Sequence, residues 1–212
     1  ILNNGAFMER NAALAIMDKL RIATIDHMTH IDNLDSIFEH GLLAHNNPYK
    51  KIDISNQEVN QRRNRKEPIY NRNTHDYVPL YFNPRNAMLY RNQKQFGDAI
   101  VILAFKKDTI LLENTLFTNG NAASDGTKCS NDISELELKD WNWPMIWSRS
   151  WNDSTNADEV KWSMMAEVLV YQKLEMSQLQ EIYCSSQRVE SYIKNRYNLQ
   201  DIKVAVNTDV FF

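Results

Sequence analysis

The stretch that most constrains the fold is Lys161–Val170, with the sequence KWSMMAEVLV. Six of the seven residues in MMAEVLV are apolar, which predicts a buried strand. The exception is Glu167, and a buried carboxylate without a partner costs several kcal/mol. Either Glu167 faces solvent from an edge of a sheet, or the rest of the chain supplies a partner and a function for it.

The composition indicates one folded domain covering residues 1–212. The chain is 43% hydrophobic and 24% charged, and five Trp, nine Tyr and eight Phe argue against disorder. No stretch of 18 apolar residues and no apolar N-terminal signal occur, so we expect no membrane association and a cytoplasmic protein. The only cysteines, Cys129 and Cys184, lack the spacing of a metal site, and we assign them no role.

The charges are unevenly distributed along the chain. Between Lys50 and Lys94 there are ten Lys or Arg and four Asp or Glu, which gives this segment +6 and leaves −9 for the rest of the net −3. This contrast is typical either of a surface that binds an anion such as nucleic acid, or of a solvated basic loop.

The N-terminal part predicts a helix, a strand and a second helix. Residues 1–22 form an extension in which Met8–Ile22 has the spacing of a packing helix. A strand is expected at Thr24–Thr29, followed by a helix that is capped at Asp32 and ends at Gly41. Polar groups at the exit of such a strand are well placed for a ligand.

The remaining pattern predicts an α+β domain with a central sheet. Pro48–Asn73 lacks periodicity and is expected to be a long binding loop with one helical turn. The other expected elements are strands at Val78–Phe82, Asp98–Phe105, Thr109–Leu112 and Ile202–Asn207, a short helix at Asn86–Tyr90, a turn-rich segment at Leu116–Ser124, a polar loop at Asn152–Glu159, and helices at Ser177–Ile182 and Gln187–Arg196.

Several chemistries are disfavoured because their motifs are missing. The sequence has no GxxxxGK[ST], GxGxxG, HExxH, CxxC or GxSxG motif, so it predicts neither a Rossmann or P-loop nucleotide site, nor a metal centre, nor a serine hydrolase. A buried carboxylate, an Arg-rich loop and a His-bearing strand end suit glycosyl transfer, in which a carboxylate stabilises a cationic centre on a sugar.

Five blocks of the sequence carry a resemblance to a known family. The blocks are HMTHIDNLDSIFEHGLLAHN at His27–Asn46, QRR at Gln61–Arg63, HDYVPLYFNPRNAMLY at His75–Tyr90, FTNGNAAS at Phe117–Ser124, and AEVLV at Ala166–Val170. Together they resemble the DarT family, bacterial toxins that ADP-ribosylate bases in single-stranded DNA. They occur in the order found in the family and extend over about Ile25 to Asn207.

The resemblance implies an α+β, ADP-ribosyltransferase-like fold with a split central mixed β-sheet flanked by helices. It implies NAD as co-substrate, single-stranded DNA as substrate with thymidine as the modified base, and a macrodomain antitoxin like DarG as partner. We expect a monomer without a metal site.

The resemblance also assigns residues. Glu167 and Arg62, the first Arg of the family's ERR motif, are the expected catalytic residues. His27, Thr29, Asn33, Gly41 and Arg62 are the expected NAD contacts, with Tyr77, Phe82 and Met88 around the nicotinamide, and Arg85 and Trp151 are the expected DNA contacts.

This chain departs from the family at three places, and other functions remain open. Asp26 replaces a common Tyr, Asn119 a frequent Asp, and Lys161 is followed by Trp, Ser and two Met where several basic residues are usual. The alternatives are the same transfer to guanine or to RNA, an NAD-dependent RNA phosphotransferase, and a non-catalytic nucleic-acid-binding domain.

Overall fold

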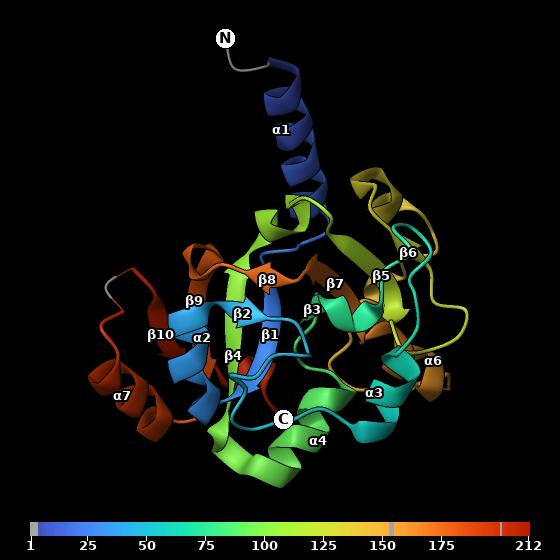
Figure 1. Ribbon diagram of the computed structural model, residues 1–212. Coiled ribbons are helices and arrows are strands. Elements are labelled where there is room, and N and C mark those ends of the chain that lie inside the picture. Colours follow the sequence, from blue (N-terminus) through green and yellow to red (C-terminus); the bar gives the residue numbers. More distant parts are fainter. Residues whose placement is uncertain (1–3, 153–154, 200) are drawn as a thin grey trace.

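The computed structural model describes residues 4–152, 155–199 and 201–212. In this part of the chain, eight strands form one sheet in the order β10-β9-β4-β1-β3-β7-β5-β6, and β2 and β8 form a separate pair (Figure 1). The strands are β1 (Thr24–His30), β2 (Leu42–Leu43), β3 (Tyr77–Tyr81), β4 (Ile100–Lys106), β5 (Leu116–Asn121), β6 (Cys129–Ser130), β7 (Ala166–Tyr171), β8 (Lys173–Leu174), β9 (Leu179–Cys184) and β10 (Lys203–Val206).

Helices surround this sheet (Figure 1). They are α1 (Asn4–Lys19), α2 (Leu34–His40), α3 (Gln57–Arg63), α4 (Ala87–Phe96), α5 (Trp143–Ile146), α6 (Ala157–Ser163) and α7 (Gln187–Arg196). Side-chain caps fix where several of them begin: Asn56 accepts hydrogen bonds from the first turn of α3, Asn86 does so for α4, and Ser186 does so for α7.

The sheet is nearly divided at its centre. Strand β1 pairs with β4 over seven residues, and β3 pairs with β7 over five. By contrast, β1 and β3 are joined at the single pair Asp26 and Tyr81. The halves β10-β9-β4-β1 and β3-β7-β5-β6 therefore diverge here, as the predicted split sheet requires. The sheet is mixed because β9 and β10 run parallel while the other neighbours are antiparallel.

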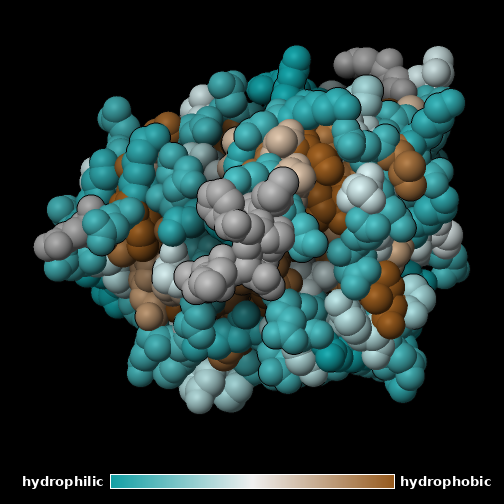
Figure 2. All heavy atoms as spheres, turned by 90° about the horizontal axis from the view of Figure 1, so that it is seen from above, coloured by the Kyte–Doolittle hydropathy of each residue, from teal (hydrophilic) through white to brown (hydrophobic). Residues whose placement is uncertain are grey.

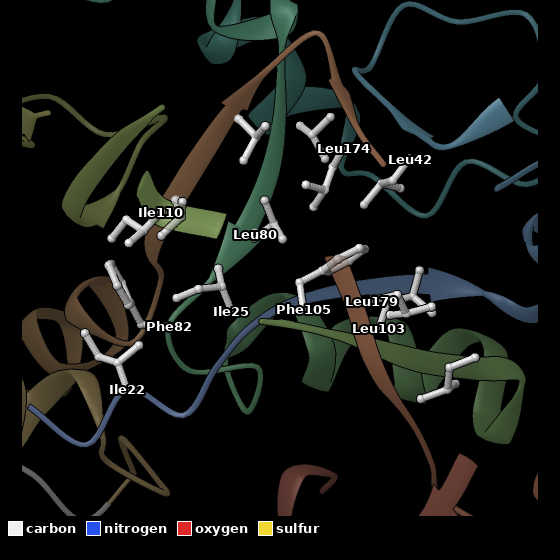
Figure 3. Packing of buried hydrophobic residues seen from close by; sticks show 14 of the residues in the cluster. Ile22, Ile25, Leu42, Leu80, Phe82, Leu103, Phe105, Ile110, Leu174 and Leu179 are labelled. Atoms are coloured by element: carbon white, nitrogen blue, oxygen red, sulfur yellow. The ribbon is translucent and has the colours of Figure 1, made fainter. Parts of the chain in front are cut away.

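Apolar side chains from both halves form the main core. Leu80, Phe82, Leu103 and Phe105 are at most 1% exposed and belong to this cluster (Figure 3). Such burial favours the folded state by roughly 1.5–3 kcal/mol for each large side chain. The core therefore holds β3 and β4 rigidly on either side of β1.

Three local predictions are wrong. Ser177–Ile182 is not a helix, because Leu179, Ile182 and Cys184 are buried at the positions where β9 packs beside β4. Thr109–Leu112 is not a strand but largely a 3-10 helix over Lys107–Leu111. Leu116–Ser124 is not mainly a turn, since pairing with β7 makes its first part strand β5.

Two predicted loops also contain helices. The segment Pro48–Asn73 includes α3, which is longer than the single turn expected. Residues 153–154 of the predicted loop Asn152–Glu159 lie outside the described residues, and α6 begins at Ala157. Lys161 belongs to α6, so the strand that carries Glu167 starts only at Ala166.

The N-terminal helix α1 projects from the domain (Figure 1). Ala13 and Met17 join the core, whereas Glu9 and Arg10 are exposed. Residues 1–3, where the expected extension begins, lie outside the described residues. The face seen along this helix is mainly hydrophilic, with hydrophobic residues in separate patches (Figure 2). Among the helices of the described residues, none has the length and apolar character to cross a membrane.

Candidate active site

Glu167 lies on β7 and is completely buried, at 0% exposure. Its Oε2 accepts a hydrogen bond from Arg63 Nη2 at 2.6 Å, and its Oε1 accepts one from Arg63 Nη1 at 3.2 Å. The backbone N–H of Ala122 also donates to Oε1 at 3.0 Å. Three donors thus satisfy the carboxylate, which answers how the apolar strand tolerates it.

Arg63 is the last residue of α3, a helix in the segment that the sequence presents as a loop. It is 8% exposed. Burial lowers the pKa of its guanidinium, but the charge of Glu167 outweighs this and raises the pKa above its ordinary value. Arg63 therefore stays cationic, and its planar fork fixes the orientation of the carboxylate.

Tyr81 and Asp26 lie beside this ion pair in the sheet. Asp26 pairs with Tyr81, which in turn pairs with Glu167, so the three side chains point to the same face. Burial, with Glu167 nearby, raises the pKa of Tyr81, so its hydroxyl is neutral and donates to Met88 Sδ at 3.2 Å. Burial also raises the pKa of Asp26 to about 7, and its Oδ1 has no hydrogen-bond partner among the described residues.

A cavity of about 830 Å³ opens where the sheet divides. Small-molecule sites typically occupy about 300–1,000 Å³. Residues of β1, β3, α3, α4 and α6 and of the loop before α3 line it. Its cationic side chains are those of Lys50, Arg62, Arg63, Arg91 and Lys161. Arg63 lines the cavity and Glu167 does not, so Arg63 stands between the carboxylate and the open space.

His27 connects the two halves of the sheet at this cavity. Its Nδ1 lies 2.7 Å from the carbonyl oxygen of Pro79 on β3. Burial lowers the pKa of His27 to about 4, so the ring is neutral at physiological pH. With Nδ1–H donated to Pro79, Nε2 is left as a hydrogen-bond acceptor.

Asn33 holds the loop before α3 against the cavity. Its Oδ1 accepts from the backbone N–H groups of Lys51 and Ile52, at 3.0 and 2.9 Å. Its Nδ2 donates to the carbonyl of Ile52 at 2.9 Å and to Thr29 Oγ1 at 3.2 Å. Asn33 thus shapes the wall of the cavity through four hydrogen bonds.

Gly41 ends α2 and lines the same cavity. Its φ of 82° is unfavourable for other residues. A Cβ there would also lie 3.1 Å from the backbone carbonyl oxygen of Leu174, so β8 leaves little room for a side chain.

Comparison with known proteins identifies the family. The family described as "ssDNA thymidine ADP-ribosyltransferase, DarT" matches residues 27–212. The chain belongs to the DarT family. This confirms the prediction made from the five sequence blocks.

Relatives and solved structures agree with the match. A DNA ADP-ribosyl transferase of Thermus sp. is 34% identical over 177 residues, which are 78% of this chain and 82% of that protein. A fusion protein of Thermosipho africanus, with DNA ADP-ribosyl transferase and glycohydrolase parts, is 30% identical over 91% of this chain, and the chain spans 50% of its length. The structure of Thermus sp. 2.9 DarT with ADP-ribosylated ssDNA has a TM-score of 0.77 at 27% identity, covering 91% and 97% of the two chains.

The DarT structural match confirms the predicted ADP-ribosyltransferase-like fold. Most of the residues predicted from the resemblance line the cavity: His27, Thr29, Asn33, Gly41, Arg62, Tyr77, Met88 and Trp151. Arg62 is exposed and forms no ion pair with a described residue. Tyr77 contributes to the wall while its hydroxyl donates to Glu67 Oε1 at 3.0 Å.

Phe82 and Arg85 lie elsewhere. Phe82 lies among the core residues (Figure 3). Its ring meets Trp141 and Trp143 edge-on, because alternation along the strand directs it away from Tyr81. Arg85 does not line the cavity. Its guanidinium packs over the Phe212 ring at 4.2 Å.

The sequence prediction missed Arg63, Tyr81 and a pair of histidines. Arg63 follows Arg62 directly, and neighbouring helix residues point about 100° apart, but nothing local tells which one faces inward. The rings of His45 and His75 lie in the cavity wall with centroids 4.9 Å apart and planes tilted by 31°, and His75 Nε2 is buried without a partner among the described residues. They are far apart in sequence, so only the fold brings them together. The described residues contain no cluster of His, Cys, Asp or Glu suited to a metal ion.

Proposed function

We propose that this chain is an NAD-dependent mono-ADP-ribosyltransferase that modifies thymidine in single-stranded DNA. The observation that carries the proposal is the buried Glu167, held by Arg63, which itself lines the cavity in the split sheet. The family match, and the Thermus sp. 2.9 DarT structures with NAD+ and with ADP-ribosylated ssDNA, support it.

The cavity suits NAD in size and charge. Its volume of about 830 Å³ falls in the range for a ligand of this size. The side chains of Lys50, Arg62 and Arg91 can face a pyrophosphate, and the neutral ring of His27 can accept a hydrogen bond from a ribose or amide group. Thr29, Asn33 and Gly41 shape the wall around it.

We place the nicotinamide at the part of the cavity wall that Tyr77 and Met88 help to form, and Met88 Sδ lies 3.2 Å from the Tyr81 hydroxyl. Phe82 supports this region from the core side instead of touching the ligand. A planar ring fits beside the aromatic and thioether groups, because both offer polarisable surface.

In the reaction, the bond between the nicotinamide nitrogen and C1′ of the ribose breaks, and nicotinamide leaves with the electron pair. Positive charge develops at C1′, where Glu167 stabilises it and binds a ribose hydroxyl. A ring nitrogen of thymine then bonds to C1′, and its proton passes to the Glu167 carboxylate. Because Arg63 covers Glu167, we infer that the ribose hydroxyl replaces one of the two hydrogen bonds between them.

Arg63 and Arg62 have different roles in this mechanism. Arg63 orients Glu167 and faces the developing charge on the reacting base. Arg62, exposed on the cavity wall, binds the pyrophosphate or the DNA backbone. This assigns to Arg63 part of the chemistry that the sequence motif suggested for Arg62.

The fusion protein of Thermosipho africanus joins a DNA ADP-ribosyl transferase to a DNA ADP-ribosyl glycohydrolase. We therefore propose that this chain acts as a toxin and that a DarG-like macrodomain antitoxin reverses its modification. The activity belongs in the cytoplasm, where NAD and DNA are both present. We retain a single domain and a monomer as predictions, which analytical ultracentrifugation tests.

The test is the intact mass of short oligonucleotides after incubation with the protein and NAD. DNA and RNA oligomers, each with one type of reactive base, identify the substrate. We expect one ADP-ribose on thymidine-containing DNA, no adduct with Glu167→Ala, and normal activity with Glu175→Gln, whose exposed carboxylate lies outside the cavity. An unmodified thymidine oligomer, or an undiminished adduct with Glu167→Ala, would refute the proposal.

A further inference from the structure

One part of the cavity wall is a loop without helix or strand, residues 47–56, which we call the cavity loop. Lys50 and Ile52 of this loop line the cavity, whereas Lys51 between them does not. The side chain of Lys51 therefore extends away from the cavity. Because no helical or sheet hydrogen bonds hold the cavity loop, its position depends on contacts with neighbouring elements.

The side chain of Lys51 ends on Asp35, in the first turn of α2, with Nζ and Oδ2 3.0 Å apart. The same carboxylate accepts three hydrogen bonds from the Arg196 guanidinium at 2.8–3.1 Å and one from the Tyr197 hydroxyl at 2.7 Å. These contacts, with those of Arg196 the strongest, hold the pKa of Asp35 well below its ordinary value, so the carboxylate stays charged. Asp35 therefore joins the cavity loop to the end of α7.

The end of α7 is a firm anchor for this carboxylate. Arg196 is the last residue of α7, which lies beside α2 (Figure 1). Val189 and Ile193 of α7 are buried in the main core. The ring of Tyr197 packs against that of Phe38 on α2, with centroids 4.9 Å apart. Lys51 is therefore held, through Asp35, against a rigid part of the domain.

We propose that Asp35 is a positioning residue for NAD binding, and that with Arg196 it holds Lys51 and so keeps the cavity loop where NAD requires it. The inference rests on the proposed function. Asp35 does not line the cavity, so it acts through the loop and not by touching the ligand. A loop that is ordered before the ligand arrives loses less conformational entropy on binding, which lowers the dissociation constant.

An isolated pair of exposed charges would not fix a loop, because such pairs contribute little to stability. The contact at Asp35 differs in its geometry. The Arg196 fork binds both carboxylate oxygens, which sets the orientation of the carboxylate before Lys51 reaches it. The Tyr197 hydroxyl adds a further donor to Oδ1. Four hydrogen bonds thus hold the carboxylate in place for the fifth, from Lys51.

The experiment measures kcat and the KM for NAD with a thymidine oligomer, and the NAD dissociation constant by titration calorimetry. Asp35→Asn and Lys51→Met should each raise the KM and the dissociation constant about 3- to 30-fold, because the loop then spends only part of its time in the binding position. We expect kcat to stay within about twofold. Lys51→Arg keeps the cation and should bind NAD as the wild type does. The double variant should be no weaker than the weaker single variant, because both changes remove one contact.

Asp98 provides the matched control, because it ties the other end of α7. It accepts hydrogen bonds from Ser186 at 3.0 Å and from Arg188 at 2.8 Å. Its side chain is 34% exposed, compared with 35% for Asp35, and it does not line the cavity. Asp98→Asn should lower the thermal unfolding temperature about as much as Asp35→Asn does, but leave the KM for NAD unchanged.

The outcomes separate this inference from the proposed function. If the wild type modifies DNA while Asp35→Asn and Lys51→Met have the same KM for NAD as Asp98→Asn, the positioning role is refuted and the activity stands. Additive losses in the double variant would also refute it. If the wild type binds NAD more tightly than both variants but forms no adduct, the activity is refuted and the positioning role stands.

Two further results are covered by the same measurements. A wild type that binds no NAD would refute both proposals. If Asp35→Asn does not fold, Lys51→Met decides, because the Lys51 side chain is 53% exposed and its replacement leaves the core intact.

Discussion

Arg63 and Glu167 form a two-point ion pair with Nη2–Oε2 and Nη1–Oε1 distances of 2.6 and 3.2 Å, and their side chains are 9% and 0% exposed. The residues are 104 positions apart in the chain, so only the packing of α3 against β7 brings them together. Burying either charged group without the other would strongly destabilise the folded state. The pair therefore ties the formation of the active site to the folding of the segment before β3.

The two arginines should differ in their kinetics. Arg63→Lys keeps a positive charge but loses the fork that holds both carboxylate oxygens, so we expect kcat to fall about 100-fold or more. Arg62→Lys should mainly raise KM, by about tenfold or less, because Arg62 is exposed on the cavity wall. Steady-state kinetics with NAD and a thymidine oligomer measure both, and a larger loss of kcat for Arg62→Lys would reverse the assignment.

Removing the charge of Arg63 should also affect stability. Arg63→Ala leaves Glu167 buried without a cation, at a cost of roughly 3–5 kcal/mol in the free energy of unfolding. The double variant Arg63→Ala/Glu167→Gln should recover part of this loss. Urea unfolding tests this, and additive losses in the double variant would contradict it.

Asp26 should make stability depend on pH. Burial raises its pKa to about 7 in the folded state, whereas the unfolded side chain ionises near 3.8. Between these values the folded state binds more protons, so the contribution of Asp26 to stability is present below about pH 4 and is lost as pH rises through about 7. Asp26→Asn should remove this loss, which is at most about 4 kcal/mol.

Urea unfolding of the wild type and Asp26→Asn at pH 4.5 and pH 8 measures the difference. The variant should gain more over the wild type at pH 8 than at pH 4.5. An equal difference at both values would show that Asp26 ionises normally in the folded protein.

Gly120 should be required for the position of Trp162. A Cβ at Gly120 would lie 2.2 Å from Trp162 Cε2, which is impossible without movement of the indole. Trp162 lines the cavity, and its Nε1 donates to Thr127 Oγ1 at 3.1 Å. Gly120→Ala should therefore cost about 1–3 kcal/mol and weaken substrate binding.

Replacing the indole by a smaller side chain should relieve this clash. We expect Gly120→Ala/Trp162→Leu to be less destabilised than the sum of the single variants. Thermal unfolding tests this coupling. Additive effects would mean that Trp162 has free space to move.

The sequence predicts well those features that depend on one segment. The strand holding Glu167, the helix Gln187–Arg196 and the short strand after it follow from local periodicity, and the structure contains all three. The spacing of hydrophobic residues in each of these segments fits only one type of secondary structure. An NAD site is predicted only from the blocks that resemble the DarT family, because the sequence contains no glycine-rich nucleotide-binding motif.

The features that the sequence did not predict depend on partners elsewhere in the chain. The segment Leu179–Cys184 becomes a strand only because β4 and β10 flank it. Helix α3 consists mainly of polar residues, so its sequence shows no apolar face that would predict a helix. Its position is explained only by the contact of Arg63 with the buried Glu167. The ring contacts of Tyr90 with Trp151 and Phe212 likewise join three distant segments.

The most direct test of this account is the single-turnover rate of ADP-ribose transfer by Glu167→Gln, at saturating NAD and thymidine oligomer. Glutamine has nearly the same shape but no charge to stabilise the centre that forms at C1′. We predict a rate at least 100-fold below that of the wild type, with an NAD dissociation constant within about fivefold. A rate within threefold of the wild type would contradict the central role of Glu167.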